Sequence, residues 1–183
     1  MGLQQPHSCQ IPELFTEFLS KSRYLYCCTL DRYQRPHVVP LFFIFDRSRC
    51  SILCVTERKS KKVHNMRYNP YVSFTTDEVH AKNPLLNTGL MIETVAEIRE
   101  AGDQVAEVLT RLQIKYPAFF DTRLFSNYIY DQEVLIVAHF LKLVYWRGPF
   151  FRRFNCPVHR KKESPFWQNR THSSSRKTGK VSK

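Results

Sequence analysis

Six stretches of the chain alternate or concentrate apolar residues in the manner of β-strands, with polar turns between most of them. Val, Ile, Phe, Tyr, Thr and Cys dominate these stretches, and such residues suit a pleated, half-buried surface. Pro40 has no N–H to donate to a strand ladder, so the second strand should carry a bulge or lie at an edge. We also expect an irregularity near Thr94 in the fifth strand. The six predicted strands are residues 24–30, 37–45, 51–56, 71–76, 88–99 and 134–146.

Three other stretches have a helical period. Apolar residues at helical spacing over residues 11–20 predict a short amphipathic helix. Ser60 is a good N-cap for a brief helix over residues 61–69, and a longer helix is predicted over residues 103–116. Residues 119–131 are rich in aromatic side chains but follow no period.

The order of these elements favours a mainly β fold with appended helices. Strands joined by consecutive hairpins pair antiparallel, and closing such a sheet into a barrel removes its exposed edges. We therefore predict a six-stranded antiparallel barrel or curled sheet with short helices. The predicted organisation is a helical segment over residues 1–20, one domain over residues 21–156 and a basic tail over residues 157–183.

The positive charge of the chain is concentrated in this tail. The 183 residues fit one domain, and their 43% hydrophobic content is that of a globular protein. The formal net charge is +12, and residues 157–183 hold eight Lys or Arg against one Glu, so the tail carries +7 of it. A basic tail can bind nucleic acid or an acidic surface. The alternative is a solvated, disordered end that aids solubility.

Three absences narrow the class of protein further. No stretch approaches the roughly 20 consecutive apolar residues that span a bilayer, so we expect no membrane partner. Residues 1–10 are polar and carry no signal sequence, which leads us to expect a cytoplasmic protein. The six cysteines form no CxxC pair with zinc-ligand spacing, and we interpret them as reduced, mostly buried thiols without a metal. A zinc site built from Cys50, Cys54 and a distant His is the alternative.

The most informative segment is the turn that follows the third predicted strand. It brings four cations and the hydroxyl of Ser60 to the N-terminus of the brief helix. Free backbone N–H groups and the helix dipole favour an anion such as phosphate at that place. The alternative is a solvated basic turn. The four cations are Arg58, Lys59, Lys61 and Lys62.

From residue 24 to residue 98 the sequence resembles the FMN-binding split β-barrels of the pyridoxamine 5′-phosphate oxidase-like superfamily. Residues 35–40 (Arg-Pro-His-Val-Val-Pro) resemble the second-strand entry of that family, and residues 56–62 resemble its phosphate-binding turn. Residues 63–74 and 88–98 resemble the helix and strands that follow, and a looser match continues to Trp146. The resemblance implies a split β-barrel.

The same resemblance implies an FMN-binding flavoprotein that acts as an oxidoreductase on a small molecule. Lys61 and Lys62 would contact the FMN phosphate, and Ser60 would assist. Since the family holds its flavin at a dimer interface, a homodimer is also implied. No catalytic side chain is assigned, because the flavin carries the redox chemistry. The other implied flavin contacts are Val55 and Thr56 along the ring system, the backbone of Val38, Val39, Pro40 and Leu41 on its other side, and Trp146, for which an aromatic lid on the barrel is the alternative role.

The chain departs from the vitamin oxidases of this family at two places. Val39 stands where their second strand contributes an arginine to the phosphate clamp, and residues 150–156 do not match their arginine-rich substrate motif. These departures argue against the vitamin oxidase activity. They leave open the flavin reductases and the enzymes that use a deazaflavin coenzyme on the same barrel.

Two further alternatives come from other classes of protein. Heme binding would need an axial ligand, for which a strand histidine such as His139 is the candidate. A non-catalytic binding module would use Arg152, Arg153 and the tail on nucleic acid. Aromatic and basic residues interleave over residues 145–147 and 150–154, which suits base stacking, but a buried strand end has the same pattern.

Overall fold

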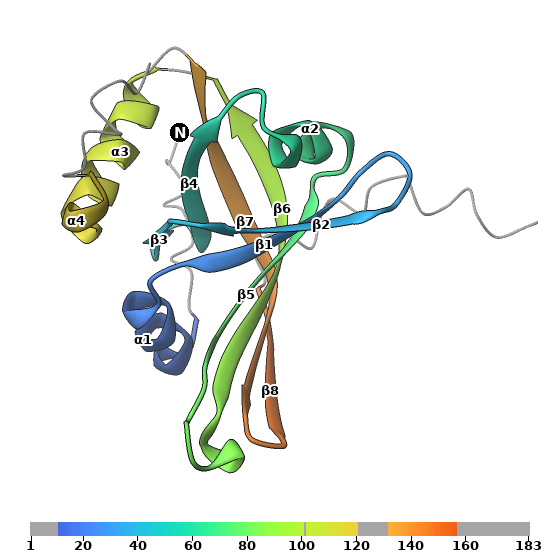
Figure 1. Ribbon diagram of the computed structural model, residues 1–183, viewed down its shortest axis with the longest axis vertical. Helices are drawn as coiled ribbons and strands as arrows, with labels where there is room; N and C mark the ends of the chain where they lie inside the picture. The colour runs from blue at the N-terminus through green and yellow to red at the C-terminus, as the bar shows by residue number, and fades with distance from the viewer. Residues whose placement is uncertain (1–10, 101, 121–131, 157–183) are drawn as a thin grey trace, which may run out of the picture.

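The computed structural model describes residues 11–100, 102–120 and 132–156, and its described part is a strongly curled antiparallel sheet with helices around it (Figure 1). The predicted tail and most of residues 119–131 lie outside these ranges. The helices are α1 (Glu13–Lys21), α2 (Lys61–Tyr68), η1 (Pro84–Leu86), α3 (Asp103–Lys115) and α4 (Pro117–Phe120). The strands are β1 (Leu25–Leu30), β2 (Pro36–Leu41), β3 (Ile44–Asp46), β4 (Ser51–Glu57), β5 (Tyr71–Glu78), β6 (Thr88–Arg99), β7 (Glu133–Arg147) and β8 (Phe150–Asn155).

The strand order explains why the sheet curls into a split barrel. The order is β2-β1-β5-β6-β7-β4-β3, and β8 pairs with β7 beside this path. The two end strands, β2 and β3, are consecutive in the chain and are joined by Phe42 and Phe43 alone. A two-residue link spans only about 10 Å, so the two edges of the sheet must meet at this seam. The predicted antiparallel split barrel is therefore confirmed.

Two hydrophobic clusters hold the barrel and its covering helix. The larger fills the barrel interior, where Phe74 and Phe140 are fully buried and α1 contributes Phe15, Phe18 and Leu19. The smaller joins α3 to the outer side of the sheet, where Val108 and Leu112 pack with Leu53 and Val137. Burial of the side chains in these two clusters stabilises the fold by roughly 25 cal/mol for each Å² of apolar surface removed from water.

Eight strands replace the six that the sequence predicts for this part of the chain. The predicted second strand is divided into β2 and β3 because the chain turns the corner of the barrel at Phe42 and Phe43. The additional strand β8 pairs with β7 from Lys142↔Asn155 to Arg147↔Phe150. Gly148, whose φ is +52°, lies between these two strands and donates its N–H to the carbonyl of Asn87 at 2.8 Å.

Two local predictions about the strands are confirmed. Within the described residues β2 pairs with β1 alone, so Pro40 lies in an edge strand where its missing N–H is tolerated. The register of β6 against β7 shifts between Glu93 and Thr94, which is the predicted irregularity. Of the helices in the described part, none is long and apolar enough to cross a membrane.

Among the five cysteines that the structure describes, one departs from the prediction. Cys27, Cys28, Cys54 and Cys156 are free thiols, as expected. Cys50 is disulfide-bonded, so the interpretation of all six as reduced is wrong for this residue. The bond also removes Cys50 from the alternative zinc set.

Candidate functional site

The predicted anion site is the turn that joins β4 to α2. The N–H of Arg58 donates to the carbonyl of Gln132 at 2.7 Å, and the N–H of Ser60 donates to the carbonyl of Glu57 at 3.1 Å. Both bonds are between backbone groups, so they hold the turn without using its side chains. The basic side chains of the turn are therefore available for other contacts.

Buried contacts fix α2, whose N-terminus forms one wall of the turn. Val63 is fully buried and Met66 is 2% exposed, and Met66 packs in the cluster that fills the barrel. Asn65 is also buried and donates from Nδ2 to Thr29 Oγ1 on β1 at 3.0 Å. Because a buried amide needs its partner, this bond sets the rotation of α2 over the barrel.

Glu100 ties the turn to the end of β6 and to the last turn of α2. Its Oε2 lies 3.2 Å from Arg58 Nε, and its Oε1 accepts a hydrogen bond from Arg67 Nη2 at 2.7 Å. The Arg58 contact is an ion pair without hydrogen-bond alignment. Arg58 is therefore occupied by a carboxylate, and the cations left for a ligand at this turn are lysines.

Ser60 occupies the N-cap of α2 without acting as a side-chain cap. Its φ of −66° and ψ of 148° are those of an N-cap, but its hydroxyl makes no capping hydrogen bond. Ser60 Oγ is buried and has no hydrogen-bond partner among the described residues. Buried polar atoms in native proteins nearly always have a partner, so an orphaned hydroxyl beside free helix N–H groups is a position that a ligand can complete.

The two lysines of α2 lie in different environments although they are adjacent in the sequence. Lys61 is exposed, whereas Lys62 is half-buried near Cys27, Cys54 and Glu57. Burial lowers the pKa of Lys62 below its ordinary value, although the nearby thiols and carboxylate oppose this shift. Burial also raises the pKa of Cys27 to about 12, so this neighbour is a neutral thiol and does not neutralise the ammonium.

These features fit the phosphate of a cofactor. The described residues place no carboxylate in an ion pair with Lys62, although a buried ammonium normally has such a partner. A phosphate at the N-terminus of α2 would neutralise Lys62, accept from Ser60 Oγ and meet the free N–H groups of the first turn. Of the predicted phosphate contacts, Ser60, Lys61 and Lys62 thus lie together at one helix end.

The four predicted residues of β2 divide between the two faces of the strand. Val38 is 56% exposed, and Pro40 is exposed beside it on the outer face. Val39 packs against the barrel cluster and Leu41 is buried in it, so their side chains are not available to a flavin. One edge of β2 has no strand partner in the described part, and its backbone groups are free to bind a ligand.

The predicted contacts on β4 are more buried. Thr56 is 7% exposed, and Val55 packs against the cluster under α3. A ring system could reach them only at the end of the strand, where the turn to α2 begins.

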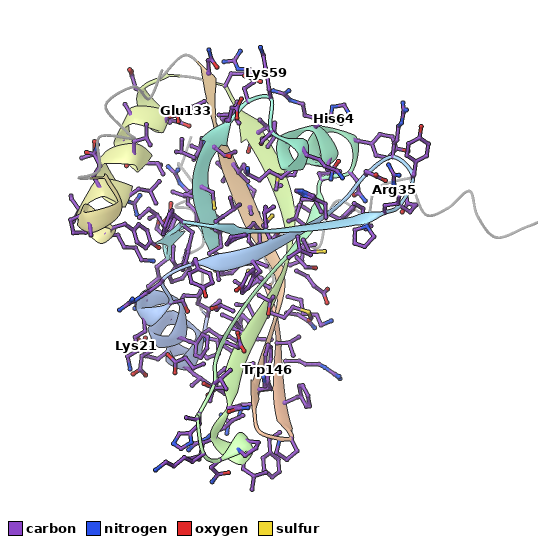
Figure 2. The ribbon with its side chains drawn as sticks, viewed as in Figure 1. Lys21, Arg35, Lys59, His64, Glu133 and Trp146 are labelled. Carbon is purple, nitrogen blue, oxygen red and sulfur yellow. The ribbon has the colours of Figure 1, made fainter. Side chains whose placement is uncertain are left out.

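Trp146 lies far from the turn within one chain. Figure 2 shows Trp146 at the lower end of the molecule and Lys59 and His64 at the upper end. Its strand position faces Gly89 of β6 and Phe151 of β8. The structure therefore does not bring Trp146 together with Ser60, Lys61 and Lys62 in a single protomer.

One face of the sheet is covered by none of the described helices. Their apolar sides pack elsewhere, those of α1 and α2 in the barrel cluster and that of α3 in the second cluster. Two cross-strand rows follow this open face, and they include the exposed Tyr26 and Val38 and the ion pair of Lys142 Nζ with Glu93 Oε1 at 2.7 Å. The rows are Pro40–Tyr26–Thr75–Met91–Val144 and Val38–Cys28–Ser73–Glu93–Lys142.

Glu133 is a buried carboxylate beside the turn that the sequence did not single out. It is 3% exposed and stands directly opposite Glu57 on β4, and its Oε2 has no hydrogen-bond partner among the described residues. Burial raises the pKa of Glu133 to about 7. The only signal in the sequence is a single acid at the start of a hydrophobic strand, which is also common at strand ends in solvent.

His139, the candidate axial ligand, already has a partner on the neighbouring strand. Its Nε2 lies 3.6 Å from Glu97 Oε2, and its side chain is largely covered. A heme iron would have to displace this contact.

Comparison with known proteins agrees with the fold. The family model described as pyridoxamine 5′-phosphate oxidase matches residues 11–141. No curated protein matches the chain in sequence.

Solved structures share the fold at low sequence identity. An F420 reductase is 19% identical with a TM-score of 0.58, and the match covers 73% of this chain and 98% of that one. A FAD-binding protein from Mesorhizobium loti is 20% identical with a TM-score of 0.54, covering 74% and 92%. The heme storage protein HutZ from Vibrio cholerae is 18% identical with a TM-score of 0.55, covering 80% and 95%. At these identities the likeness is one of fold.

Proposed function

The chain belongs to the pyridoxamine 5′-phosphate oxidase family, and from this premise we propose that it is an FMN-binding flavoprotein that works as an oxidoreductase on a small molecule. The observation that carries the proposal is the incomplete anion site at the N-terminus of α2. An orphaned hydroxyl at Ser60 and a half-buried ammonium at Lys62 both lack a partner that a phosphate would supply.

When bound, FMN supplies the hydride or electron transfer, and the chain supplies binding and orientation. Lys62 and Ser60 would hold the phosphate, with Lys61 adding a more exposed and weaker contact. The unpaired edge of β2 would offer backbone N–H and C=O groups to the ring system. The fixed rotation of α2, set by the bond from Asn65 to Thr29, keeps the phosphate contacts in place relative to β1.

We propose that the working form is a homodimer joined through the open face. This face carries the exposed side chains of Tyr26 and Val38, and a second copy would bury them. The separation of Trp146 from α2 supports the same arrangement, because Trp146 could contact a flavin at this turn only if it came from the partner.

The chemistry of the turn favours a phosphate-bearing cofactor over heme, and of these cofactors we propose FMN. The relatives named above include a FAD-binding protein, an F420 reductase and a heme storage protein. Heme needs an axial ligand, and His139 is engaged with Glu97. A deazaflavin coenzyme is the second candidate, since it also carries phosphate. The proposed compartment is the cytoplasm, where most thiols stay reduced. Of the five described cysteines, four are free and Cys50 is disulfide-bonded.

The test is the visible absorption spectrum of the purified protein, followed by extraction and mass analysis of the cofactor. The proposal expects oxidised flavin and FMN in the extract, and a dimer by light scattering. A heme spectrum would show that the cofactor is heme rather than FMN, and a deazaflavin in the extract would show that it is a deazaflavin. A chain that takes up no cofactor when titrated with FMN would refute it.

A further inference from the structure

The β7–β8 hairpin carries a motif that the flavin proposal does not use. Aromatic and basic residues interleave in it, and the sequence left two explanations open, a buried strand end and a surface for stacking bases. Tyr145 and Phe154 pack against the core cluster, but the residues at the tip of the hairpin, 150–153, are not buried. Phe150 is 77% exposed, Phe151 is 63% exposed, and Arg152 and Arg153 are also exposed.

The strand register sorts these residues onto two faces of the hairpin. Tyr145 stands opposite Arg152, and Arg147 stands opposite Phe150, so these four side chains share one face. Trp146, Phe151 and Arg153 point to the other face, which continues the open face of the sheet. The first face therefore alternates two aromatic rings with two guanidinium groups and is separate from the proposed flavin contacts.

This first face borders a hollow. Its volume is about 340 Å³, and Tyr145, Arg147, Phe150 and Arg152 line it together with Leu14 of α1. Tyr145 forms one fixed wall, because Phe15 and Phe18 pack edge-on against its ring at centroid distances of 6.3 Å and 5.8 Å. A ring stacking on Tyr145 would meet a wall already held in place.

No carboxylate of the described residues neutralises the guanidinium groups at this hollow. Within the described residues neither Arg147 nor Arg152 forms an ion pair, whereas Arg47, Arg58, Arg67 and Arg99 each do. Glu13, the acid next to Leu14, is paired with Arg47 at 2.9 Å. Two unpaired arginines between two aromatic rings form a site for an anionic group attached to a planar ring.

We propose that this hollow, which we call the arginine–aromatic hollow, binds nucleotide chemistry: a heterocyclic base stacked on Tyr145 or Phe150, with its phosphate held by Arg147 and Arg152. The ligand is either a free mononucleotide or one unit of a single strand of nucleic acid. The inference does not rest on FMN binding at α2. Its failure would leave that proposal untouched.

Two probes distinguish the sources of this chemistry, both with the full-length chain. Binding of AMP is measured by calorimetry, and binding of a fluorescently labelled dT12 single strand is measured by anisotropy at two salt concentrations. Similar affinities would assign the hollow to a free nucleotide. Binding of dT12 at least tenfold tighter than that of AMP, and weakened by salt, would assign it to a single strand.

Matched variants test the hollow itself. R152Q and F150S alter exposed side chains, so the fold should survive, and the melting temperature checks this. Each should weaken the binding of the preferred probe about tenfold or more. R153Q removes the same charge from the other face of the same strand and should change the affinity by less than about threefold.

Three results would overturn the inference. One is that neither AMP nor dT12 binds to the unaltered protein at millimolar concentration. Another is that R153Q weakens binding as much as R152Q does, which would make the effect one of overall charge. The third is that dT12 binds to R152Q and F150S as it does to the unaltered chain, which would assign the binding to the basic tail.

Discussion

The indole ring of Trp146 lies directly on the backbone of Gly89, its partner across the β6–β7 ladder. A Cβ atom at residue 89 would overlap the ring atoms Cζ2 and Cε2 of Trp146. Glycine is therefore required here by the close approach of a neighbouring side chain. The contact sets the position of Trp146 on the open face, where we propose that it reaches the flavin of a second protomer.

Gly89→Ala should destabilise the protein by about 1–3 kcal/mol, because the added methyl group forces the indole away from its position. Urea denaturation measures this loss. The double variant G89A/W146A should be less destabilised than the sum of the two single changes, since the overlap disappears with the ring. Full additivity would mean that the two residues do not touch.

Ser60→Ala should distinguish between two roles of Ser60, that of a ligand contact and that of a helix cap. The hydroxyl makes no hydrogen bond in the ligand-free protein, so the melting temperature without flavin should stay nearly unchanged. The affinity for FMN should fall about tenfold, because a hydrogen bond to a charged group contributes about 1.5 kcal/mol or more. A loss of stability with unchanged FMN affinity would make Ser60 an ordinary N-cap.

FMN affinity should fall at alkaline pH because of Lys62. Burial lowers the pKa of the free ammonium, and a bound phosphate would raise it again, so binding takes up a proton between the two pKa values. The loss of affinity should therefore begin below pH 10.5, the ordinary pKa of lysine. Titrations with FMN at a series of pH values measure it. Lys62→Arg, which stays charged, should flatten the curve, and an equally steep curve in that variant would contradict the role of Lys62.

Glu133 should make the protein less stable as the pH rises. In the folded protein its pKa is about 7 against an ordinary value of 4.5, so the folded state holds this proton more tightly. Its stabilising effect is complete below about pH 4.5 and is lost as the pH rises through about 7. Glu133→Gln should raise the free energy of unfolding on the order of 1–3 kcal/mol at pH 8 and hardly at all at pH 5. Equal effects at both pH values would exclude titration of Glu133 as the cause.

The barrel could be predicted from the sequence because its strands are long and bounded by strong turn signals. Pro40 lacks a backbone N–H donor and so predicted an edge strand. The change of pattern near Thr94 predicted the irregularity in β6. The strand β8 could not be predicted, because Phe150, Phe151, Arg152 and Arg153 do not alternate between apolar and polar positions. Residues 150–153 are exposed on both faces of the strand, so burial imposed no period on them.

The helix start that carries the candidate site was predictable, but the surroundings of its side chains were not. A serine and two lysines at a helix start indicate an anion site, and the structure brings them together at one helix end. The difference between Lys61 and Lys62 depends on how α2 packs over β1, which local sequence does not encode. The inward orientation of Val39 and the distance of Trp146 from α2 likewise follow from the curl of the sheet.

The most direct test of the account is the dissociation constant for FMN of K61A/K62A, compared with that of K59A. All three lysines lie at the same turn, but Lys59 precedes the helix and has no part in the proposed phosphate site. The double variant should bind FMN about a hundredfold more weakly, since two charge-assisted contacts of about 1.5–3 kcal/mol each are lost. K59A should bind it within about threefold of the unaltered protein. Equal FMN affinity in the double variant and the unaltered protein would contradict the phosphate site on which the proposed function depends.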